Sequence, residues 1–249
     1  MGFDMHALTR FGIEHLSPSS LNLWRSSPGL WALRYVAKIK DDGNAAMWRG
    51  KAVEDGFAAL LRGTDIRAAQ SMALQTFDQN AQGESSDTID AEREMIGPMI
   101  FSASLGWQKP GPLNATQLKV EHWFDDVPVP VIGYLDFAFD GVDVDLKTTK
   151  ACPSTPRPDH VRQVALYRAA RGRDAGILYV TAKKHQYFHI DDDTCERALG
   201  DLQSCALALT QFLDRMPSKK DVLRCLPMDS DHYAFPKLKV PLAEVLLAG

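Results

Sequence analysis

The segment VIGYLDFAFDGVDVDLKTTK, from Val131 to Lys150, contains the pattern that decides the fold. Two short apolar runs flank Asp140 and Gly141. This dipeptide is typical of the two-residue type I′ turn that joins antiparallel strands. A hairpin with that turn has a fixed register, in which Asp136 lies directly opposite Asp145.

Strand alternation gives this hairpin one charged face. Asp143, Asp145 and Lys147 point to that face, and the register adds Asp136. Opposed carboxylates in a sheet repel one another, and partial burial makes their charged forms costlier. A divalent cation between Asp136 and Asp145 would compensate, with Lys147 beside it directed toward a phosphate or an attacking water. The alternative is a solvated strand face whose charges have no function.

Size and composition indicate a soluble globular protein. The chain has 249 residues, of which 45% are hydrophobic and 24% are charged, so it can form one large domain or two small ones. It contains no run near the roughly 18 apolar residues needed to cross a bilayer, and its N-terminus lacks the basic and apolar regions of a signal peptide. We therefore expect a cytoplasmic protein.

Cysteine usage gives no sign of a zinc or disulfide framework. The four cysteines are far apart and include no CxxC pair, which argues against a zinc ribbon and against a set of disulfides. Free thiols are expected at Cys152, Cys195, Cys205 and Cys225.

Charge is distributed unevenly along the chain. The formal net charge is −4, which argues against a generally basic nucleic-acid coat. Directly after the hairpin, however, seven basic residues stand against the single acid Asp159. A positive patch beside an acidic site suits a polyanionic substrate held by its phosphates, although a helix with an arginine-rich solvent face would give the same pattern. The basic residues are Lys147, Lys150, Arg157, Arg162, Arg168, Arg171 and Arg173.

The chain is expected to form a short arm and one domain. Residues 1–16 show no clear periodicity and are interpreted as a loosely held N-terminal arm. The domain would span residues 17–249 and contain two amphipathic helices as an insert at about 65–105. The last part, at about 221–249, has three prolines between apolar residues and is expected to pack as irregular segments.

One predicted helix carries a candidate site residue. Asn44 is suited to cap a helix over Ala45 to Leu61, in which Gly50 and Glu54 share one side. Glycine in the middle of a helix costs about 1 kcal/mol relative to alanine, so Gly50 indicates a close approach by backbone or ligand. Glu54 would be directed toward whatever approaches. Taken alone, a solvent-facing role is the simpler interpretation of Glu54.

The remaining elements follow from the same periodicities. Gln163 and Tyr167 lie four residues apart in a predicted helix and therefore share its face. Ser17 and Pro18 are typical of a helix start. Strands are expected over Thr116 to Phe124, Ala175 to Ala182 and His185 to Ile190, and helices over Asp65 to Asn80, Thr88 to Leu105, His160 to Arg171 and Asp191 to Met216.

The order of these elements resembles the PD-(D/E)XK nuclease superfamily, and within it the RecB-like and Cas4-like exonuclease branch. Five sequence elements match in order, and the resemblance spans roughly Ser17 to Ile190. Their combined order and spacing are more specific than any one of them. They are Ser17-Pro18-Ser19-Ser20-Leu21, Arg49-Gly50 with Glu54, Gly133-Tyr134-Leu135-Asp136, Asp145-Leu146-Lys147-Thr148 and Gln163-Val164-Ala165-Leu166-Tyr167.

The resemblance implies an α/β fold: a mixed sheet flanked by helices in a restriction-endonuclease-like core, with a helical insert. It also implies that Asp136 and Asp145 bind a catalytic Mg²⁺ or Mn²⁺, with the main-chain carbonyl of Leu146 as a further ligand. Lys147 would orient or activate the attacking water and stabilise charge on the phosphate. With the basic block, the resemblance makes five residues the expected contacts to substrate: Gln163, Tyr167, Arg49, Arg162 and Lys150.

Two departures from the branch pattern affect the expected cofactors. Many RecB-like and Cas4-like proteins have a histidine ligand where this chain has Glu54, but a carboxylate is usual in other branches, so Glu54 is expected to bind metal. Cas4-like proteins commonly hold an iron-sulfur cluster. Here Ser27 stands where the first cysteine would be, and Cys225 is the only cysteine of the tail. No cluster is therefore expected.

These observations together predict a metal-dependent deoxyribonuclease, an exonuclease acting on DNA ends or single strands in recombination, repair or phage DNA processing. No membrane partner is expected, while a homo-oligomer and a recombination or replication partner stay open. One alternative is a nuclease-fold protein that binds DNA or another protein without cutting. The presence of Asp136, Asp145 and Lys147 together argues against it. The other is an unrelated α/β protein with an accidental acidic hairpin, against which the combined spacing argues.

Overall fold

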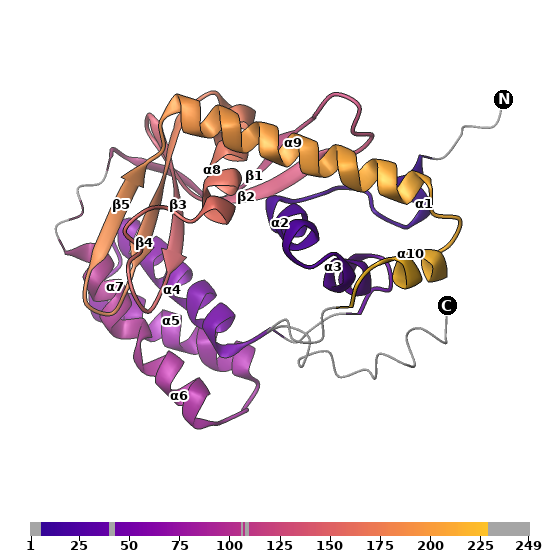
Figure 1. The fold of residues 1–249 in the computed structure, drawn as a ribbon. Helices are drawn as coiled ribbons and strands as arrows, with labels where there is room; N and C mark the ends of the chain where they lie inside the picture. The colour runs from indigo at the N-terminus through magenta and orange to yellow at the C-terminus, as the bar shows by residue number, and fades with distance from the viewer. Residues whose placement is uncertain (1–5, 40–42, 106, 108–109, 229–249) are drawn as a thin grey trace. The chain divides into compact units, whose positions relative to one another are not determined.

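A five-stranded mixed sheet forms the centre of the fold (Figure 1). The computed structural model describes residues 6–39, 43–105, 107 and 110–228. Strand β3 is the middle strand; it runs antiparallel to β2 and parallel to β4, and β4 runs antiparallel to β5. The predicted mixed α/β architecture is confirmed. In the order in which they lie in the sheet, the strands are β1 (Leu113–His122), β2 (Val131–Phe139), β3 (Val142–Thr148), β4 (Asp174–Val180) and β5 (His185–His189).

The helices lie before, between and after the strands (Figure 1). Within the part of the chain that the structure describes, they are α1 (Ala7–Arg10), α2 (Pro18–Ser26), α3 (Pro28–Tyr35), α4 (Ala45–Leu61), α5 (Ile66–Ala81), α6 (Asp87–Glu94), α7 (Ile96–Ser104), α8 (Pro158–Arg171), α9 (Asp192–Asp214) and α10 (Lys219–Cys225). No helix of this described part is long and apolar enough to cross a membrane.

The chain divides into two compact units. One consists of Met1–Asp42, Glu121–Gly133 and Glu196–Gly249, and the other of Gly43–Val120 and Tyr134–Cys195. Every residue that the sequence predicts for the site belongs to the second unit, which we call the site unit. A single domain over residues 17–249 stays a prediction.

Apolar packing between the sheet and the helices α4 to α7 forms the core of the site unit. Phe57 of α4 meets Phe137 of β2 edge to face, with ring centroids 5.5 Å apart. Burying a side chain of this size contributes about 1.5–3 kcal/mol. The same cluster contains Val144 and Leu146 of β3. One face of the hairpin is therefore apolar and covered, which fixes the other face as the charged one.

Helix α8 makes the crossover between the parallel strands β3 and β4. It begins with Pro158 in its first turn, where proline is tolerated, and its C-cap is Gly172 with a left-handed φ of +63°. Arg171 of α8 donates a hydrogen bond to Asp143, which lies on the charged face of β3. Helix α8 therefore covers the face on which the predicted site residues lie.

The predicted insert at about 65–105 is helical. The second helix expected there, Thr88 to Leu105, is divided at Met95 into α6 and α7. Ser86 caps α6 by accepting a hydrogen bond from the N–H of Ile89, whereas no side chain caps α7. The division therefore lacks the capping residue by which a helix start is recognised in sequence.

The N-terminal segment differs from the loosely held arm predicted over residues 1–16. Residues 1–5 lie outside the described residues, but the rest contains α1, and Arg10 donates a hydrogen bond of 3.0 Å to the carbonyl of Leu213. A four-residue helix is too short to show a helical period, which is why the sequence does not reveal it. The buried apolar residues of the segment are Ala7, Leu8, Phe11, Ile13 and Leu16.

The predicted irregular tail begins inside a helix. Lys219–Cys225 form α10, which starts at Ser218, whose side chain accepts a hydrogen bond from the N–H of Asp221. The rest of the tail, from residue 229 onward, lies outside the described residues.

Candidate active site

The hairpin β2–β3 has the predicted register. Gly141 has a φ of +91° in the turn, and the paired residues include Phe137 with Val144 and Ala138 with Asp143. Glycine adopts this left-handed conformation without the steric cost that a side chain would bring. Asp140 lacks the positive φ that a type I′ turn requires, so the predicted turn type is wrong, but the register still brings the two predicted carboxylates to the same face of adjacent strands.

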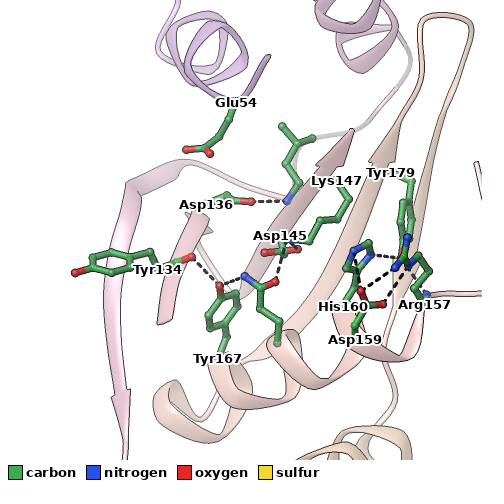
Figure 2. A network of polar contacts seen from close by, with 12 residues as sticks. Glu54, Tyr134, Asp136, Asp145, Lys147, Arg157, Asp159, His160, Tyr167 and Tyr179 are labelled. Carbon is green, nitrogen blue, oxygen red and sulfur yellow. Dashed lines mark hydrogen bonds and ion pairs between the residues drawn. The ribbon is translucent and has the colours of Figure 1, made fainter. Parts of the chain in front are cut away.

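The side chain of Asp136 accepts a hydrogen bond from the backbone of the neighbouring strand β3. The backbone N–H of Leu146 donates to its Oδ2 at 2.7 Å, and the residue is 8% exposed (Figure 2). Burial raises the pKa of Asp136 well above its usual range, and the neighbouring charges of Asp145 and Glu54 raise it further. A group that compensates this negative charge would stabilise the ionised form.

Asp145 is the most enclosed carboxylate of the site. Its side chain is fully buried, and Oδ2 lies 2.8 Å from Nζ of Lys147 in an ion pair. Apart from Lys147, no donor among the described residues reaches either of its oxygens. Burial raises the pKa of Asp145, although Lys147 opposes the shift. Buried carboxylate oxygens with few donors are free to coordinate a cation.

Lys147 is held by a chain of hydrogen bonds (Figure 2). Its Nζ donates to Oε1 of Gln163 at 3.0 Å, and Nε2 of Gln163 donates to the hydroxyl of Tyr167. That hydroxyl donates to the carbonyl of Tyr134 at 2.7 Å. Burial alone would lower the pKa of Lys147, but Asp145 and Asp136 outweigh burial and the pKa is raised. The chain joins β2, β3 and α8 around one ammonium group.

Tyr167 is inside the protein rather than on its surface. Its side chain is fully buried, and burial together with the nearby carboxylates raises its pKa well above the usual range. Sequence reasoning expects Gln163 and Tyr167 to contact substrate. The structure places them behind Lys147, where they orient the lysine; direct contact with substrate stays a prediction.

Glu54 reaches the site from α4. Asn44 caps this helix as predicted, because its side chain accepts a hydrogen bond from the N–H of Met47. The Glu54 side chain is 17% exposed, and burial raises its pKa although Lys51, 3.4 Å away, opposes the shift. Gly50 lies one helical turn earlier, where a Cβ would meet Oγ1 of Thr148 at 3.4 Å. Only this side-chain atom of β3 lies near Gly50, at an ordinary contact distance, so the close approach of backbone predicted for Gly50 is not observed.

Gln117 is a site residue that sequence reasoning missed. Its Nε2 donates to Oε1 of Glu54 at 2.6 Å and to Oδ1 of Asp136 at 3.1 Å. The residue has a φ of +51° within β1. The periodicity of apolar residues in a sequence does not reveal a left-handed residue inside a strand, so the sequence gives no signal for this contact.

The three basic residues expected to bind substrate differ in accessibility. Arg49 is buried in an ion pair with Glu92 of α6 and donates to the carbonyl of Thr148 at 3.3 Å. Arg162 is 9% exposed. Lys150 has a side chain that is 72% exposed, with Nζ 3.0 Å from Oε1 of Glu92. Contact with substrate stays a prediction for all three, and exposure favours Lys150.

A second polar cluster lies beside Lys147 on the same face (Figure 2). Tyr179 of β4 is the register partner of Lys147, and its hydroxyl accepts a hydrogen bond of 3.0 Å from the N–H of Arg157. Nδ1 of His160 lies 2.7 Å from the same hydroxyl. Burial, followed by the charge of Lys147, lowers the pKa of His160 to about 4. His160 is therefore neutral at physiological pH.

An open pocket borders the site. It has a volume of about 360 Å³ and lies between α4, α5 and β1. Glu54 and Gln117 line one part of it, and Arg62, Gln75 and Gln79 line another. The helical insert, to which sequence reasoning assigns no chemistry, thus forms one wall of a cavity that opens on a candidate metal ligand.

The residues present fit a divalent cation. Carboxylate and carbonyl oxygens are the ligands that Mg²⁺ and Mn²⁺ prefer, and the Asp145 carboxylate, which only Lys147 contacts among the described donors, supplies such oxygens. Among the described residues, no three His, Cys, Asp or Glu side chains already surround one point. The amide of Gln117 stands between Glu54 and Asp136.

Comparison with known proteins identifies the family. The family model of the PD-(D/E)XK nuclease superfamily matches residues 15–227. This chain belongs to the PD-(D/E)XK nuclease superfamily. Members of the superfamily generally use divalent metal ions. No curated protein sequence is significantly similar to this superfamily member.

One solved structure shares the fold. A candidate exonuclease from Eubacterium rectale superposes with a TM-score of 0.59 at 14% identity, covering 94% of this superfamily member and 91% of that protein. Two others are less similar. SSO0001 has a TM-score of 0.30 at 12% identity, covering 64% of this chain and 75% of its own. LHK-Exo, solved in complex with dAMP, has a TM-score of 0.32 at 11% identity, and the match covers 68% of this chain and 96% of LHK-Exo.

Proposed function

We propose that this chain is a divalent-metal-dependent deoxyribonuclease that acts as an exonuclease on DNA ends or single strands. The observation that best supports the proposal is the fully buried carboxylate of Asp145, whose Oδ2 lies 2.8 Å from Nζ of Lys147 and which has no other donor among the described residues. Burying an unsatisfied carboxylate is costly, so such a group is retained where it has a function.

The proposed metal ligands all provide oxygen atoms. Asp136, Asp145 and the carbonyl of Leu146 would hold Mg²⁺ or Mn²⁺, with Glu54 as an additional ligand. When bound, the ion supplies positive charge for the phosphate and lowers the pKa of a coordinated water. The pair of buried aspartates, whose pKa values are raised by burial in its absence, supports this assignment.

Lys147 is proposed to orient the attacking water and to stabilise charge on the phosphate. Its ammonium has three N–H donors, and Asp145 and Gln163 accept two of them in the structure. The third is available to a water or a phosphate oxygen. Gln163 and Tyr167 are proposed as positioning residues, since they fix the ammonium through the hydrogen-bond chain that ends at Tyr134.

The order of the Asp-x-Lys strand and the Gln163–Tyr167 helix also supports the RecB-like and Cas4-like branch. On this basis we propose DNA in recombination, repair or phage DNA processing as the substrate. The basic side chains on and after β3, among them the exposed Lys150, would attract its phosphates.

The deciding experiment is degradation of end-labelled linear and covalently closed circular DNA, single and double stranded, with Mg²⁺, Mn²⁺ or EDTA. Metal-dependent loss of linear DNA alone is expected. Asp145→Asn should reduce the rate at least about 10³-fold, because an essential oxygen ligand loses its charge. Asp140→Asn changes an exposed carboxylate of the same hairpin and should cut normally.

Circular dichroism spectra must show that Asp145→Asn is folded. DNA that is bound but never cut by the wild-type chain would instead favour a non-catalytic binding protein on a nuclease fold. Cleavage that survives in Asp145→Asn would refute the proposed site.

A further inference from the structure

Gln117 has a backbone conformation that a strand residue rarely adopts. Its φ of +51° lies in the left-handed region, which is sparsely populated by residues with side chains. Ala115 and Leu118 pack against the same apolar cluster although they are three residues apart. In a regular strand such residues face opposite sides, so the left-handed residue interrupts the regular alternation of β1.

With this backbone conformation, the side chain of Gln117 reaches two carboxylates of the proposed metal site. Its Nε2 lies 2.6 Å from Oε1 of Glu54 and 3.1 Å from Oδ1 of Asp136. The amide nitrogen of Gln117 is the donor in both contacts, and the two carboxylates accept. One neutral group thus donates to both acids at the point where a shared cation would lie.

We infer that Gln117 is a placeholder for the cation: its amide holds Glu54 and Asp136 together in the metal-free protein and leaves when a divalent ion binds. The inference rests on the proposed function, because it takes these two carboxylates as metal ligands. The 360 Å³ pocket that Gln117 also lines gives the amide space to move into.

This role has a thermodynamic consequence that distinguishes it from metal ligation. A contact made only in the metal-free state stabilises that state and must be broken when the ion binds. Removing the contact therefore destabilises the metal-free protein, leaves the metal-loaded protein unchanged and tightens metal binding. If the amide oxygen of Gln117 were a ligand, its removal would weaken binding instead.

The test compares Gln117→Met, which keeps the length of the side chain but cannot donate, with Gln79→Met. Gln79 lines the same pocket from α5, so this control receives the same chemical change on the opposite wall. For each full-length variant, the unfolding temperature is measured in EDTA and in saturating Mn²⁺, and the Kd for Mn²⁺ is measured by titration calorimetry.

For Gln117→Met we expect a lower unfolding temperature in EDTA, an unchanged one in Mn²⁺, and Mn²⁺ binding roughly tenfold tighter, because hydrogen bonds to charged groups no longer have to be broken. Gln117→Gly should also bind Mn²⁺ more tightly. Because glycine adopts the left-handed φ without strain, this second variant keeps the test valid if Gln117→Met does not fold. Gln79→Met should behave as the wild type.

Weaker Mn²⁺ binding by Gln117→Met and Gln117→Gly, or no change in either measurement, would overturn the placeholder role while leaving the proposed nuclease site intact. If the wild-type chain bound no Mn²⁺ and Asp145→Asn gave an identical titration, the proposed metal site would be refuted. The placeholder role of Gln117 would then be refuted as well. The two failures are therefore distinguishable.

Discussion

His160 is held as a neutral imidazole in a buried cluster, and this makes the stability of the fold depend on pH. Its pKa is lowered to about 4 by burial and by Lys147, compared with about 6.5 in an unfolded chain. Between pH 6.5 and 4 the unfolded state binds a proton that the folded state does not. The contribution of His160 to stability is therefore present above pH 6.5 and is lost as the pH falls through this window, by about 3 kcal/mol at most.

Replacing His160 removes that dependence. In His160→Gln the free energy of unfolding, measured in urea at pH 7 and pH 5, should fall less with acidification than in the wild type. His189→Gln, an exposed histidine on β5, is the matched control and should keep the wild-type slope. An unaltered slope in His160→Gln would show that another group titrates in this window. Comparing variant with wild type cancels the opposite contribution of the buried aspartates.

Single site residues are predictable where a local rule fixes them. The two-residue turn at Asp140 and Gly141 determines which residue faces which, so the sequence alone assigns Asp136 and Asp145 to one face. Gln117 cannot be found in this way, because its position depends on a left-handed backbone conformation that leaves no periodic signal in the sequence. The burial of Tyr167 likewise depends on how α8 packs against β2, which helical spacing does not report.

At the level of elements, one buried ion pair connects α4, α6 and the end of β3. Arg49 is 4% exposed and Glu92 3% exposed, and Arg49 also donates to Thr148, the residue after Lys147. Removing one partner of a buried pair leaves an uncompensated charge, whereas an exposed pair contributes little. The insert is thereby attached to the strand that carries the candidate catalytic residues.

Glu92→Gln should therefore lower the free energy of unfolding by about 3 kcal/mol. The matched control is Asp78→Asn, which removes one partner of the exposed pair between Asp78 and Arg93 and should cost less than about 1 kcal/mol. Both are measured by urea denaturation. Equal losses in the two variants would mean that the buried pair has no special role. The double variant Arg49→Met/Glu92→Leu should regain much of the loss, since no charge of the buried pair is then left unpaired and Lys150, the other partner of Glu92, is exposed.

Element boundaries follow the sequence where a side chain caps the helix. Asn44 caps α4 and Ser17 and Ser20 form the capping box of α2, and both helices begin as predicted. The start of α7 has no side-chain cap, so the sequence pattern predicts one continuous helix in place of α6 and α7. The contact between Arg49 and Glu92 joins residues 43 positions apart in the chain, which no local pattern reports.

Across the whole molecule, the net charge is −4, so electrostatic attraction of a polyanion must come from locally exposed cationic side chains. The side chain of Lys150 is 72% exposed, whereas Arg162 is 9% exposed. A phosphate contact releases counterions, so its loss flattens the dependence of DNA affinity on salt.

Lys150→Gln should lower the slope of log Kd against log salt concentration by about 1. Arg162→Gln should lower the slope by less, because Arg162 is only 9% exposed. Fluorescence anisotropy with labelled single-stranded DNA in Ca²⁺ or EDTA measures both slopes without cleavage. A reduced slope in Arg162→Gln alone would place the phosphate contact on α8 and remove Lys150 from it.

The central place of β3 in the sheet also governs how the site is lost when the protein unfolds. The strand carries Asp145 and Lys147 and is paired on both sides, with β2 and with β4. Its amide hydrogens should therefore exchange with deuterium only through global opening, later than those of the edge strand β5. The candidate site would then belong to the last cooperative unit to open, and partial unfolding elsewhere would leave its chemistry in place.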